Sequence, residues 1–334
     1  MLTSPAPLRV ERDDRPAYRP FPVTVARVTE LSPHFVRVTL TDPGLATFGR
    51  DGLDQRIKIF FPLPDGSISD LGEDTSETRP AGDWYGRWRA LPPERQSPFR
   101  TYTVRAIRPD ERELDVDFVR HPADETPADA PAARWLTTAA PGNRLTVAGP
   151  DARSLHSRTG IDWKPGNARQ LLLVGDETAA PAILSILESL PPGREAHAMI
   201  EVPHEADAAA LATDYRPGIT VSWLARAGQE NPAGDIPPHG DLLDAAVTRW
   251  LDAHPELIAE AAAPRRQRLD DINVDIETLW DSPAPAGGNF YAWIAGESAV
   301  VKKLRRQLVT ERGVDRGRVA FMGYWRRGQA EKQG

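Results

Sequence analysis

The pattern of hydrophobic and polar positions changes at about residue 150. Before it, apolar and polar residues alternate over short runs, which is typical of strands with one buried face. Strands are predicted on this basis at Pro22–Thr29, Phe35–Thr41, Arg56–Phe61, Arg100–Ile107, Glu113–Val119 and Arg144–Ala148. Short strands at this spacing indicate an antiparallel barrel or sandwich.

Two segments interrupt these strands. Ala132–Ala139 has the spacing of a short helix, and Asp70–Ser97, rich in acidic residues, Trp, Gly and Pro, is predicted to be a long loop.

Later in the chain, continuous apolar runs alternate with helical patterns. Gln170–Gly175 is apolar almost throughout and ends in glycine, as a strand buried in a parallel sheet does. Further strands are predicted at Glu195–Val202, Ile219–Leu224, Phe290–Ala295 and Val319–Tyr324, with helices at Ala182–Leu190, Leu242–Ala253 and Ala299–Glu311. This alternation predicts a parallel sheet covered on both faces.

The two patterns predict an α+β chain of two domains, because 334 residues exceed what one core usually supports. An antiparallel β-barrel is expected at 18–150, followed by an α/β parallel-sheet domain at 166–328. The segment 254–288 carries clustered charges and is predicted to be an insertion into the second domain.

Composition excludes several classes of function. The chain has no cysteine, which removes disulfides, thiolate nucleophiles and cysteine-bound iron–sulfur clusters, so redox chemistry needs a bound cofactor. A net charge of −7 argues against a general nucleic-acid binder. No apolar run is long enough for a membrane span, and Met1–Pro7 does not resemble a secretion signal, so a cytoplasmic protein is expected.

The run Arg100–Arg105 is the most informative stretch for function. It places Tyr102 and small hydroxyl residues between two arginines in a predicted strand. A ring to stack on, a hydroxyl donor and fixed positive charge suit a planar, phosphorylated cofactor. An edge strand with ordinary surface charges would have the same pattern.

Two further segments have features of cofactor sites. The turn Gly175–Pro181 follows a strand and precedes a helix, but it lacks the G-x-G-x-x-G fingerprint, and Asp176 or Thr178 could simply cap that helix. Pro131–Leu136 begins a helix with small residues, whose amides could bind an anion. Arg134 and Trp135 would equally fit a surface ion pair and a core ring. No pair of the seven histidines has helical metal-ligand spacing.

These pieces recur in one order along the chain. They are Arg-x-Tyr-Thr-x-Arg at Arg100–Arg105, Pro-Ala-x-Arg-Trp at Pro131–Trp135, Pro-Gly-x-x-Leu-x-x-x-Gly-Pro at Pro141–Pro150, Gly-Asp-Glu-Thr-Ala-x-Pro-Ala at Gly175–Ala182, Trp-Ile-Ala-Gly-Glu at Trp293–Glu297 and Gly-Tyr-Trp-Arg-x-Gly at Gly323–Gly328. The ordered set resembles the siderophore-interacting protein family, flavin-dependent ferric-siderophore reductases of the ferredoxin–NADP reductase superfamily. The resemblance spans about Pro20 to Gly328.

The resemblance implies a flavin-binding barrel followed by a nucleotide-binding domain. It assigns ring stacking on FAD to Tyr102, a flavin contact to Thr103 and the pyrophosphate to Arg100, with Val104 in the same run and Arg105 supporting the clamp or reaching the substrate. It also assigns phosphate contacts to Ala132, Ala133 and Arg134, and an adenine-side contact to His121.

In the second domain the resemblance assigns the flavin and nicotinamide side to the ends of strands. The residues concerned are Asp176, Glu177, Thr178, Ala179, Glu297 and Trp325. Two departures from the family pattern are the absence of a glycine that often precedes Pro131-Ala132 and the length of segment 254–288.

The implied activity is transfer of electrons from NADPH or NADH through FAD to a ferric siderophore, releasing Fe(II) for iron acquisition. No residue is expected to act as a catalytic acid, base or nucleophile, and no metal is expected as a resident cofactor. A general NAD(P)H:flavin reductase and a non-catalytic siderophore-binding flavoprotein remain alternatives. The protein is expected to be a monomer.

Basic residues are expected to bind the ferric chelate, because such chelates are often anionic. Lys58 resembles a basic position that the family places near the flavin, and Arg56 lies on the same face of the predicted strand. Lys302 is a further candidate for binding the chelate. For NAD(P)H, Glu201 closes the second predicted parallel strand and suits a ribose 2′-hydroxyl, whereas Arg226 suits a 2′-phosphate. These two cues conflict, and the resemblance favours NADPH.

Overall fold

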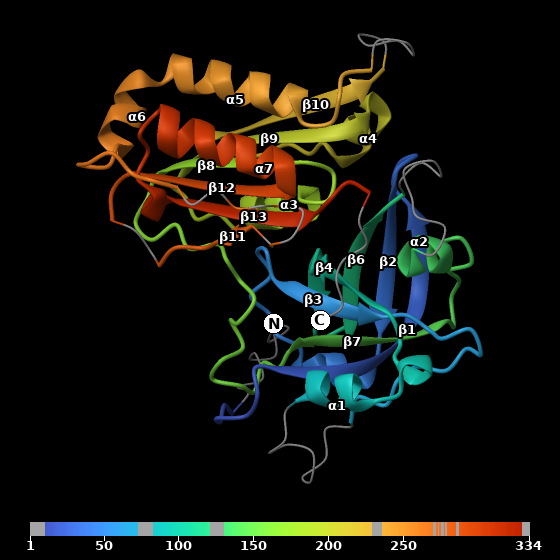
Figure 1. Cartoon of the computed structure of the whole chain (residues 1–334). Helices are drawn as coiled ribbons and strands as arrows, with labels where there is room; N and C mark the ends of the chain where they lie inside the picture. Colours follow the sequence, from blue (N-terminus) through green and yellow to red (C-terminus); the bar gives the residue numbers. More distant parts are fainter. Residues whose placement is uncertain are drawn as a thin grey trace, which may run out of the picture.

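The chain folds into two domains, each built on one sheet (Figure 1). The structure is a computed structural model, and it describes residues 11–72, 83–120, 130–228, 236–269, 272, 274, 277, 279–284 and 287–328. In this part of the chain, no helix is both long and apolar enough to cross a membrane.

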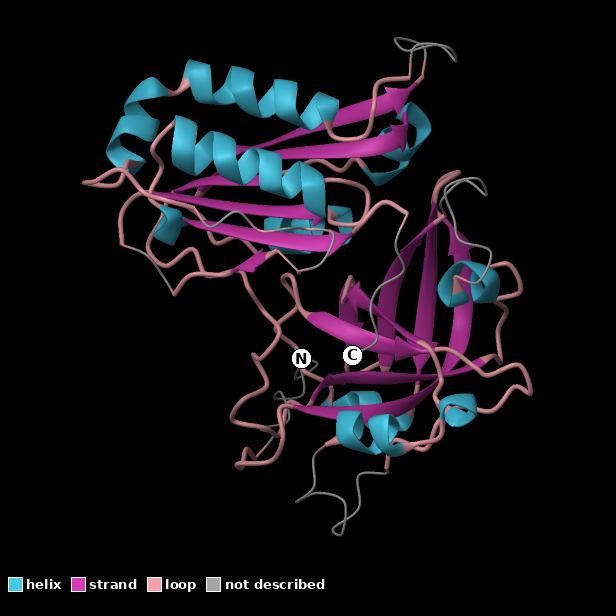
Figure 2. Cartoon of the chain, in the orientation of Figure 1, coloured by secondary structure: helices cyan, strands magenta, loops and turns pink. Residues whose placement is uncertain are grey.

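The first domain is a curled antiparallel sheet (Figure 2). It has seven strands in the order β4-β3-β7-β1-β2-β6-β5. Its strands are β1 (Tyr18–Glu30), β2 (Phe35–Thr41), β3 (Arg56–Phe60), β4 (Phe99–Thr103), β5 (Ala106–Arg108), β6 (Glu113–Val119) and β7 (Arg144–Pro150). In β1, Phe21, Val23 and Val25 are buried while the residues between them are not, which is the period-two pattern that the sequence predicted.

The predicted strand Arg100–Ile107 is two strands. β4 and β5 follow one another in the chain but form opposite edges of the sheet, since β4 pairs with β3 and β5 pairs with β6. At the break, the amide of Val104 donates to the carbonyl of Gln55 and the amide of Arg105 donates to that of Asp115. The run therefore passes from one edge of the sheet to the other and brings the barrel toward closure.

The expected loop Asp70–Ser97 contains helices. α1 (Trp84–Ala90) and the short 3-10 helix η2 (Pro93–Arg95) lie in it, and Asp83 caps α1 by accepting a hydrogen bond from the amide of Gly86. Trp88 is buried there and donates its indole N–H to the carbonyl of Ser97, at 2.9 Å. The prediction failed because a helix of seven residues is too short to show a clear helical period in the sequence, and α1 is stabilised by packing of its aromatic side chains.

The second domain is a six-stranded sheet with the order β10-β9-β8-β12-β13-β11, parallel except for β11. Its strands are β8 (Gln170–Gly175), β9 (Glu195–His204), β10 (Ile219–Ala227), β11 (Trp280–Asp281), β12 (Phe290–Glu297) and β13 (Val319–Trp325). The parallel sheet was predicted correctly, with several strands longer than expected.

Helices cover both faces of this sheet (Figure 1). They are α3 (Ala180–Glu188), α4 (Glu205–Leu211), α5 (Asp241–Ala253), α6 (Pro255–Ala261) and α7 (Ser298–Arg305), the last continuing as a π-helical turn, η3 (Arg306–Glu311). Alternate residues of β8 serve the two faces: Leu171 and Leu173 pack in the cluster with α3, and Leu172 and Val174 pack in the cluster with α5 and α7. The remaining short helices are α2 (Pro131–Leu136), which is shorter than predicted, η1 (Pro43–Thr47) and η4 (Arg316–Arg318).

A buried carboxylate joins the two domains. Asp54, just before β3, is 1% exposed and accepts hydrogen bonds from the indole N–H of Trp293 in β12 and from the amides of Asp162 and Trp163 in the connecting segment, at 3.0–3.2 Å. Burial raises the pKa of Asp54 to about 6, although these donors favour its charged form.

This pKa predicts a pH dependence of stability. A carboxyl whose pKa is higher in the folded than in the unfolded chain stabilises the fold below about pH 4, and this contribution is lost as pH rises through about 6. The free energy of unfolding of the wild type minus that of Asp54→Asn should therefore fall by about 2–3 kcal/mol between pH 4 and pH 7. Urea unfolding followed by circular dichroism measures it, with Asp51→Asn as control, and a difference that does not vary with pH would contradict the assignment.

Candidate functional site

The two faces of β4 carry different chemistry. In the register with β3, Arg100 and Tyr102 lie opposite Ile59 and Ile57, whereas Thr101 and Thr103 lie opposite Lys58 and Arg56. Directly opposed residues of an antiparallel pair share a face of the sheet. Arg100 and Tyr102 therefore belong to the barrel-core face, and the two threonines share the other face with the cations of β3.

The Arg100–Tyr102 face lies beside α2. The ring of Tyr102 is 4.4 Å from that of Phe118, whose ring is in turn 5.7 Å from that of Trp135 in α2. Pro131 occupies the first turn of α2, and no side chain caps its N-terminus. Arg100, half-buried, donates to the carbonyl of its neighbour Phe99.

The other members predicted to bind FAD are distributed differently. Ala132 packs against the barrel core, Arg134 is exposed, and Thr103 and Val104 are buried. His121 lies outside the described residues.

Arg105 joins the domains. Its guanidinium forms a two-pronged ion pair with Glu188 in α3, with nitrogen–oxygen distances of 2.9 and 2.5 Å, and its Nε lies 3.7 Å from Asp117 in β6. The expected role of Arg105 was either to support the cofactor clamp or to reach the substrate. In the structure, its guanidinium is held by two carboxylates, one on each domain.

In the second domain, Asp176 brings three strand ends together. Its Oδ1 accepts hydrogen bonds from the amide and the hydroxyl of Thr178, and its Oδ2 accepts from the amide of Glu297 and the indole N–H of Trp325, both at 2.8 Å. Thus the ends of β8, β12 and β13 meet at one carboxylate, and the nicotinamide-side role that the resemblance assigns to these residues stays a prediction. A side chain at Gly296 has no room there, because its Cβ would lie 2.6 Å from Oδ2 of Asp176.

Glu297 has a second task at the same edge. Its carboxylate caps α7 by accepting hydrogen bonds from the amides of Ala299 and Val300, at 2.7 and 3.0 Å. The predicted nicotinamide-side residue is therefore fixed in place by the helix that follows it.

The residues expected to select NADPH or NADH bind each other instead. Arg226 forms ion pairs with Glu177 (3.0 Å) and Glu201 (2.9 Å). Glu201 is fully buried and also accepts from the amides of Gly240 and Leu243 at the start of α5. The carboxylate of Glu201 is thus occupied inside the domain, and two carboxylates pair with Arg226. The ribose role expected of Glu201 and the 2′-phosphate role expected of Arg226 stay predictions.

His239 belongs to this network, although no role was predicted for it. Its side chain is 7% exposed, and its Nε2 lies 3.5 Å from Asp176 and 3.7 Å from Glu177. Its ring meets that of Trp325 edge-on, with centroids 5.3 Å apart. Neither ring nitrogen has a hydrogen-bond partner among the described residues. In the sequence, the one sign of a role for His239 is its position just before a helix. Its neighbours Asp176, Glu177 and Trp325 lie far away in the sequence, so their proximity could not be predicted.

The network determines the charges at this edge. Burial raises the pKa of Glu177, but His239 and Arg226 outweigh it and lower that pKa to about 2. Burial likewise lowers the pKa of His239, but the carboxylates of Glu177 and Asp176 outweigh it, so this pKa lies above its ordinary value. His239 is thus favoured as an imidazolium between two carboxylates.

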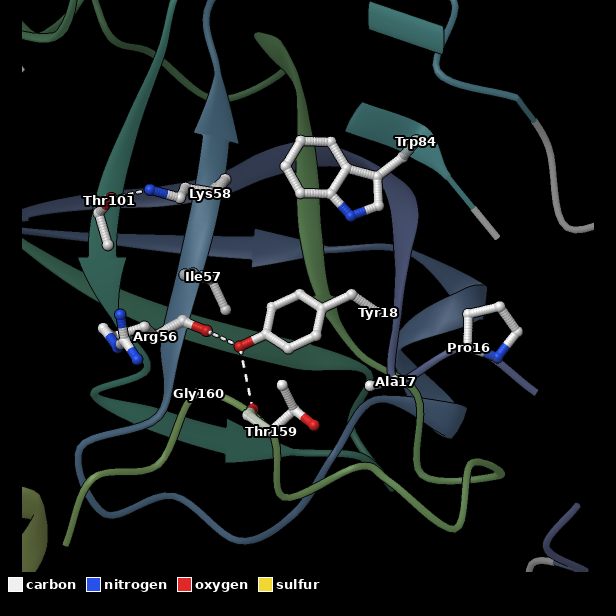
Figure 3. A pocket seen from close by; sticks show the side chains of 10 residues that line it. All are labelled: Pro16, Ala17, Tyr18, Arg56, Ile57, Lys58, Trp84, Thr101, Thr159 and Gly160. Atoms are coloured by element: carbon white, nitrogen blue, oxygen red, sulfur yellow. Dashed lines mark hydrogen bonds between the residues drawn. The ribbon is translucent and has the colours of Figure 1, made fainter. Parts of the chain in front are cut away.

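A cavity of about 400 Å³ opens on the outer face of β3 and β4 (Figure 3). Its wall carries two cations, Arg56 and Lys58, and the aromatic rings of Tyr18 and Trp84. Lys58 donates to the hydroxyl of Thr101 on β4. The remaining lining residues are Pro16, Ala17, Ile57, Thr159 and Gly160.

Two of the three predicted substrate residues meet in this cavity. Lys302 is not among its lining residues: it lies on α7 of the second domain and its Nζ donates to the carbonyl of Ile272 at 2.7 Å. Lys302 is therefore placed apart from Arg56 and Lys58, and its substrate role stays a prediction. No group of three or more His, Cys, Asp or Glu side chains in the described residues could hold a metal ion.

Both domains match models of one family. Residues 24–154 match the siderophore-interacting FAD-binding domain, and residues 168–328 match the siderophore-interacting protein model. The chain is a member of the siderophore-interacting protein family.

Known relatives of this siderophore-interacting protein match it over nearly its whole length. The ferric vibriobactin reductase of Vibrio cholerae is 27% identical over 305 residues, covering 90% of this chain and 88% of the relative. The NADPH-dependent ferric-chelate reductase of Escherichia coli is 28% identical and covers 91% of both chains. The crystal structure of a siderophore utilization protein from T. fusca superposes with a TM-score of 0.63 at 26% identity, over 95% of this chain and 96% of that one.

The donor set of the barrel fits FAD. A guanidinium and an aromatic ring share one strand face next to a helix whose N-terminus no side chain caps. These groups match a pyrophosphate and a planar ring system. The same donors would suit neither a resident metal nor an uncharged cofactor.

The His239 assignment predicts a second pH effect. A histidine with a raised pKa stabilises the fold fully below about pH 6.5, and this contribution is lost as pH rises through its higher folded value. The difference in unfolding free energy between the wild type and His239→Gln should therefore shrink between pH 6 and pH 9. Urea unfolding across this range measures it. A difference for His239→Gln that stays constant across this range would contradict an imidazolium.

Proposed function

We propose that this siderophore-interacting protein is an FAD-dependent ferric-siderophore reductase that uses NADPH or NADH as electron donor. The observation that carries the proposal is the pairing of β3 with β4. One face of this pair presents Arg100 and Tyr102 beside α2, and the other lines a cavity with Arg56 and Lys58. A cofactor face and a cationic cavity thus share two strands.

The bound FAD would accept hydride from the nicotinamide and pass single electrons to Fe(III). Siderophores have hard oxygen donors that favour Fe(III), so reduction weakens the chelate. The chain's own task is binding, orientation and electrostatics, which agrees with the absence of cysteine.

On the cofactor face, each group has a proposed role. Arg100 would bind the pyrophosphate through charge-assisted hydrogen bonds, and Tyr102 would stack on the flavin ring. The amides of Ala132 and Ala133 in the uncapped first turn of α2 would donate to phosphate oxygens.

In the second domain, the strand ends around Asp176 would receive the nicotinamide. Asp176 fixes Thr178, Glu297 and Trp325 relative to one another. Because Asp176, Glu177 and Glu201 are all buried, this edge is rigid and acidic. It would orient the uncharged amide of a nicotinamide rather than bind phosphate.

The cavity would collect the ferric chelate. The chain carries a net charge of −7, so an anionic chelate is repelled by most of the molecule and attracted where cations are concentrated. Arg56 and Lys58 supply that local charge, and the rings of Trp84 and Tyr18 supply apolar surface for a chelate scaffold.

Anaerobic absorption spectroscopy of the purified, FAD-loaded protein tests this function. NADPH or NADH should bleach the flavin, and a ferric siderophore should then restore its colour while an Fe(II) chelator captures iron. If neither donor bleaches the flavin while ferric siderophore still binds, the protein is a non-catalytic siderophore-binding flavoprotein and the reductase proposal is wrong. Faster turnover with free flavin than with any ferric siderophore would instead indicate a general flavin reductase.

Truncation of Tyr102 should weaken FAD retention. Tyr102→Ala removes the stacking ring and should raise the FAD dissociation constant by about 5-fold or more, because aromatic stacking contributes roughly 1 kcal/mol beyond the buried area. Tyr102→Phe keeps the ring and should retain FAD. Flavin absorbance after gel filtration and a fluorescence titration of the apoprotein measure this. Equal FAD affinity of Tyr102→Ala and wild type would disprove the stacking role.

A further inference from the structure

We propose that Trp280, delivered by segment 254–288, positions Arg56 in the cavity wall and so makes the cavity selective for anionic ferric chelates. This inference rests on the proposed function for the identity of the ligand. The placement of Trp280 itself follows from the packing of the two domains.

Segment 254–288, the predicted insertion, contains β11. This two-residue strand pairs antiparallel with β13 at the edge of the sheet, with Trp280 opposite Met322. The ring of Trp280 stacks on that of Tyr324, with centroids 5.8 Å apart and an angle of 14° between the planes. Tyr324 in turn meets the buried Trp293 edge-on, with centroids 6.2 Å apart. Trp280 is therefore anchored to the core of the second domain.

Its other contact is with the first domain. The guanidinium carbon of Arg56 lies 4.2 Å from the centroid of the Trp280 ring, within the range of a cation–π interaction. Nη2 of Arg56 also lies 2.9 Å from Oδ2 of Asp162, in the segment that connects the domains. Arg56 is thus held by a ring and a carboxylate that both lie outside its own sheet.

These two contacts determine the orientation of Arg56. Its Nε has no hydrogen-bond partner in the described part of the chain, and the side chain is 31% exposed. An arginine with four flexible bonds would otherwise sample many positions in water. Without Trp280, only the ion pair with Asp162 would hold the guanidinium, and we expect its charge to occupy the cavity wall for less of the time.

Lys58 is the natural comparison within the same cavity. Its Nζ donates to the hydroxyl of Thr101 on the neighbouring strand and lies 5.5 Å from the centroid of the Phe99 ring, and both of these contacts are within the barrel. Loss of Trp280 should therefore remove the pre-organised charge of Arg56 and leave that of Lys58. The effect should depend on ligand charge, because fixed cations attract an anion and add little for a neutral ligand of similar size.

The experiment measures binding to the oxidised, FAD-loaded protein by isothermal titration, without any electron donor. Two probes are used: an anionic ferric tris-catecholate and an uncharged ferric tris-hydroxamate. Trp280→Ala should raise the dissociation constant of the anionic chelate about 5- to 10-fold and change that of the uncharged chelate less than 2-fold. Trp280→Phe keeps an aromatic face and should restore most of the affinity.

Two further variants separate positioning from folding. Arg56→Lys keeps the charge but loses the planar stacking group, so it should reproduce the loss even if Trp280→Ala folds poorly. Arg316→Ala lies near the insertion, where its guanidinium is 3.4 Å from Asp281, and it should bind both chelates as the wild type does. In steady-state assays, Trp280→Ala should raise KM for the anionic chelate and leave kcat unchanged.

The outcomes distinguish the two proposals. Wild-type affinity in both Trp280→Ala and Arg56→Lys, or an equal loss for both chelates, would overturn the positioning role and leave the reductase proposal intact. Absence of binding of either chelate to the wild type would overturn both.

Discussion

The arrangement of the site depends on one buried carboxylate between the domains. Asp54 accepts the indole N–H of Trp293, which belongs to the strand beside β8 in the middle of the second sheet. It also accepts two amides of the connecting segment. Because an unpaired buried carboxylate is costly, the barrel and the second domain are stabilised in the one arrangement that supplies all three donors. Arg56 lies two residues further on, so the same contact sets its position against Trp280.

Two other polar contacts flank this link. Asp207 of α4, fully buried, accepts hydrogen bonds from the hydroxyl of Ser32 and the amide of His34, and it pairs with the His34 ring at 2.8 Å. Arg105 pairs with Glu188. These contacts are directional, unlike apolar packing, and they fix the angle between the domains. A reaction between a cofactor held by one domain and a nicotinamide held by the other requires such a fixed angle.

Much of the fold could be predicted from the sequence, because alternation in strands such as β2 and the apolar run of β8 are local signals. The break between β4 and β5 could not, since it depends on which strands lie at the two edges of the sheet. The spacing of Arg100 and Tyr102 predicts that they share a strand face, and the structure shows that they do. The ion pairs of Arg226 with Glu177 and Glu201 could not be predicted, because a local rule about strand ends does not show which charge each residue meets across the sheet. His239 and Trp280 were missed because their neighbours are distant in sequence.

The passage of Arg100–Arg105 from one edge of the barrel to the other has a thermodynamic consequence. Tyr102 and Arg105 are three residues apart, yet one faces the proposed cofactor and the other holds α3 of the second domain. A ligand that restricts the motion of Tyr102 would therefore also restrict Arg105 and its ion pair with Glu188 between the domains. The two domains should unfold as one cooperative unit when the barrel is saturated, and ligand binding free energy would then appear as stability of the whole chain. Because the chain has no disulfide, a bound cofactor would supply part of the free energy that couples the unfolding of the two domains.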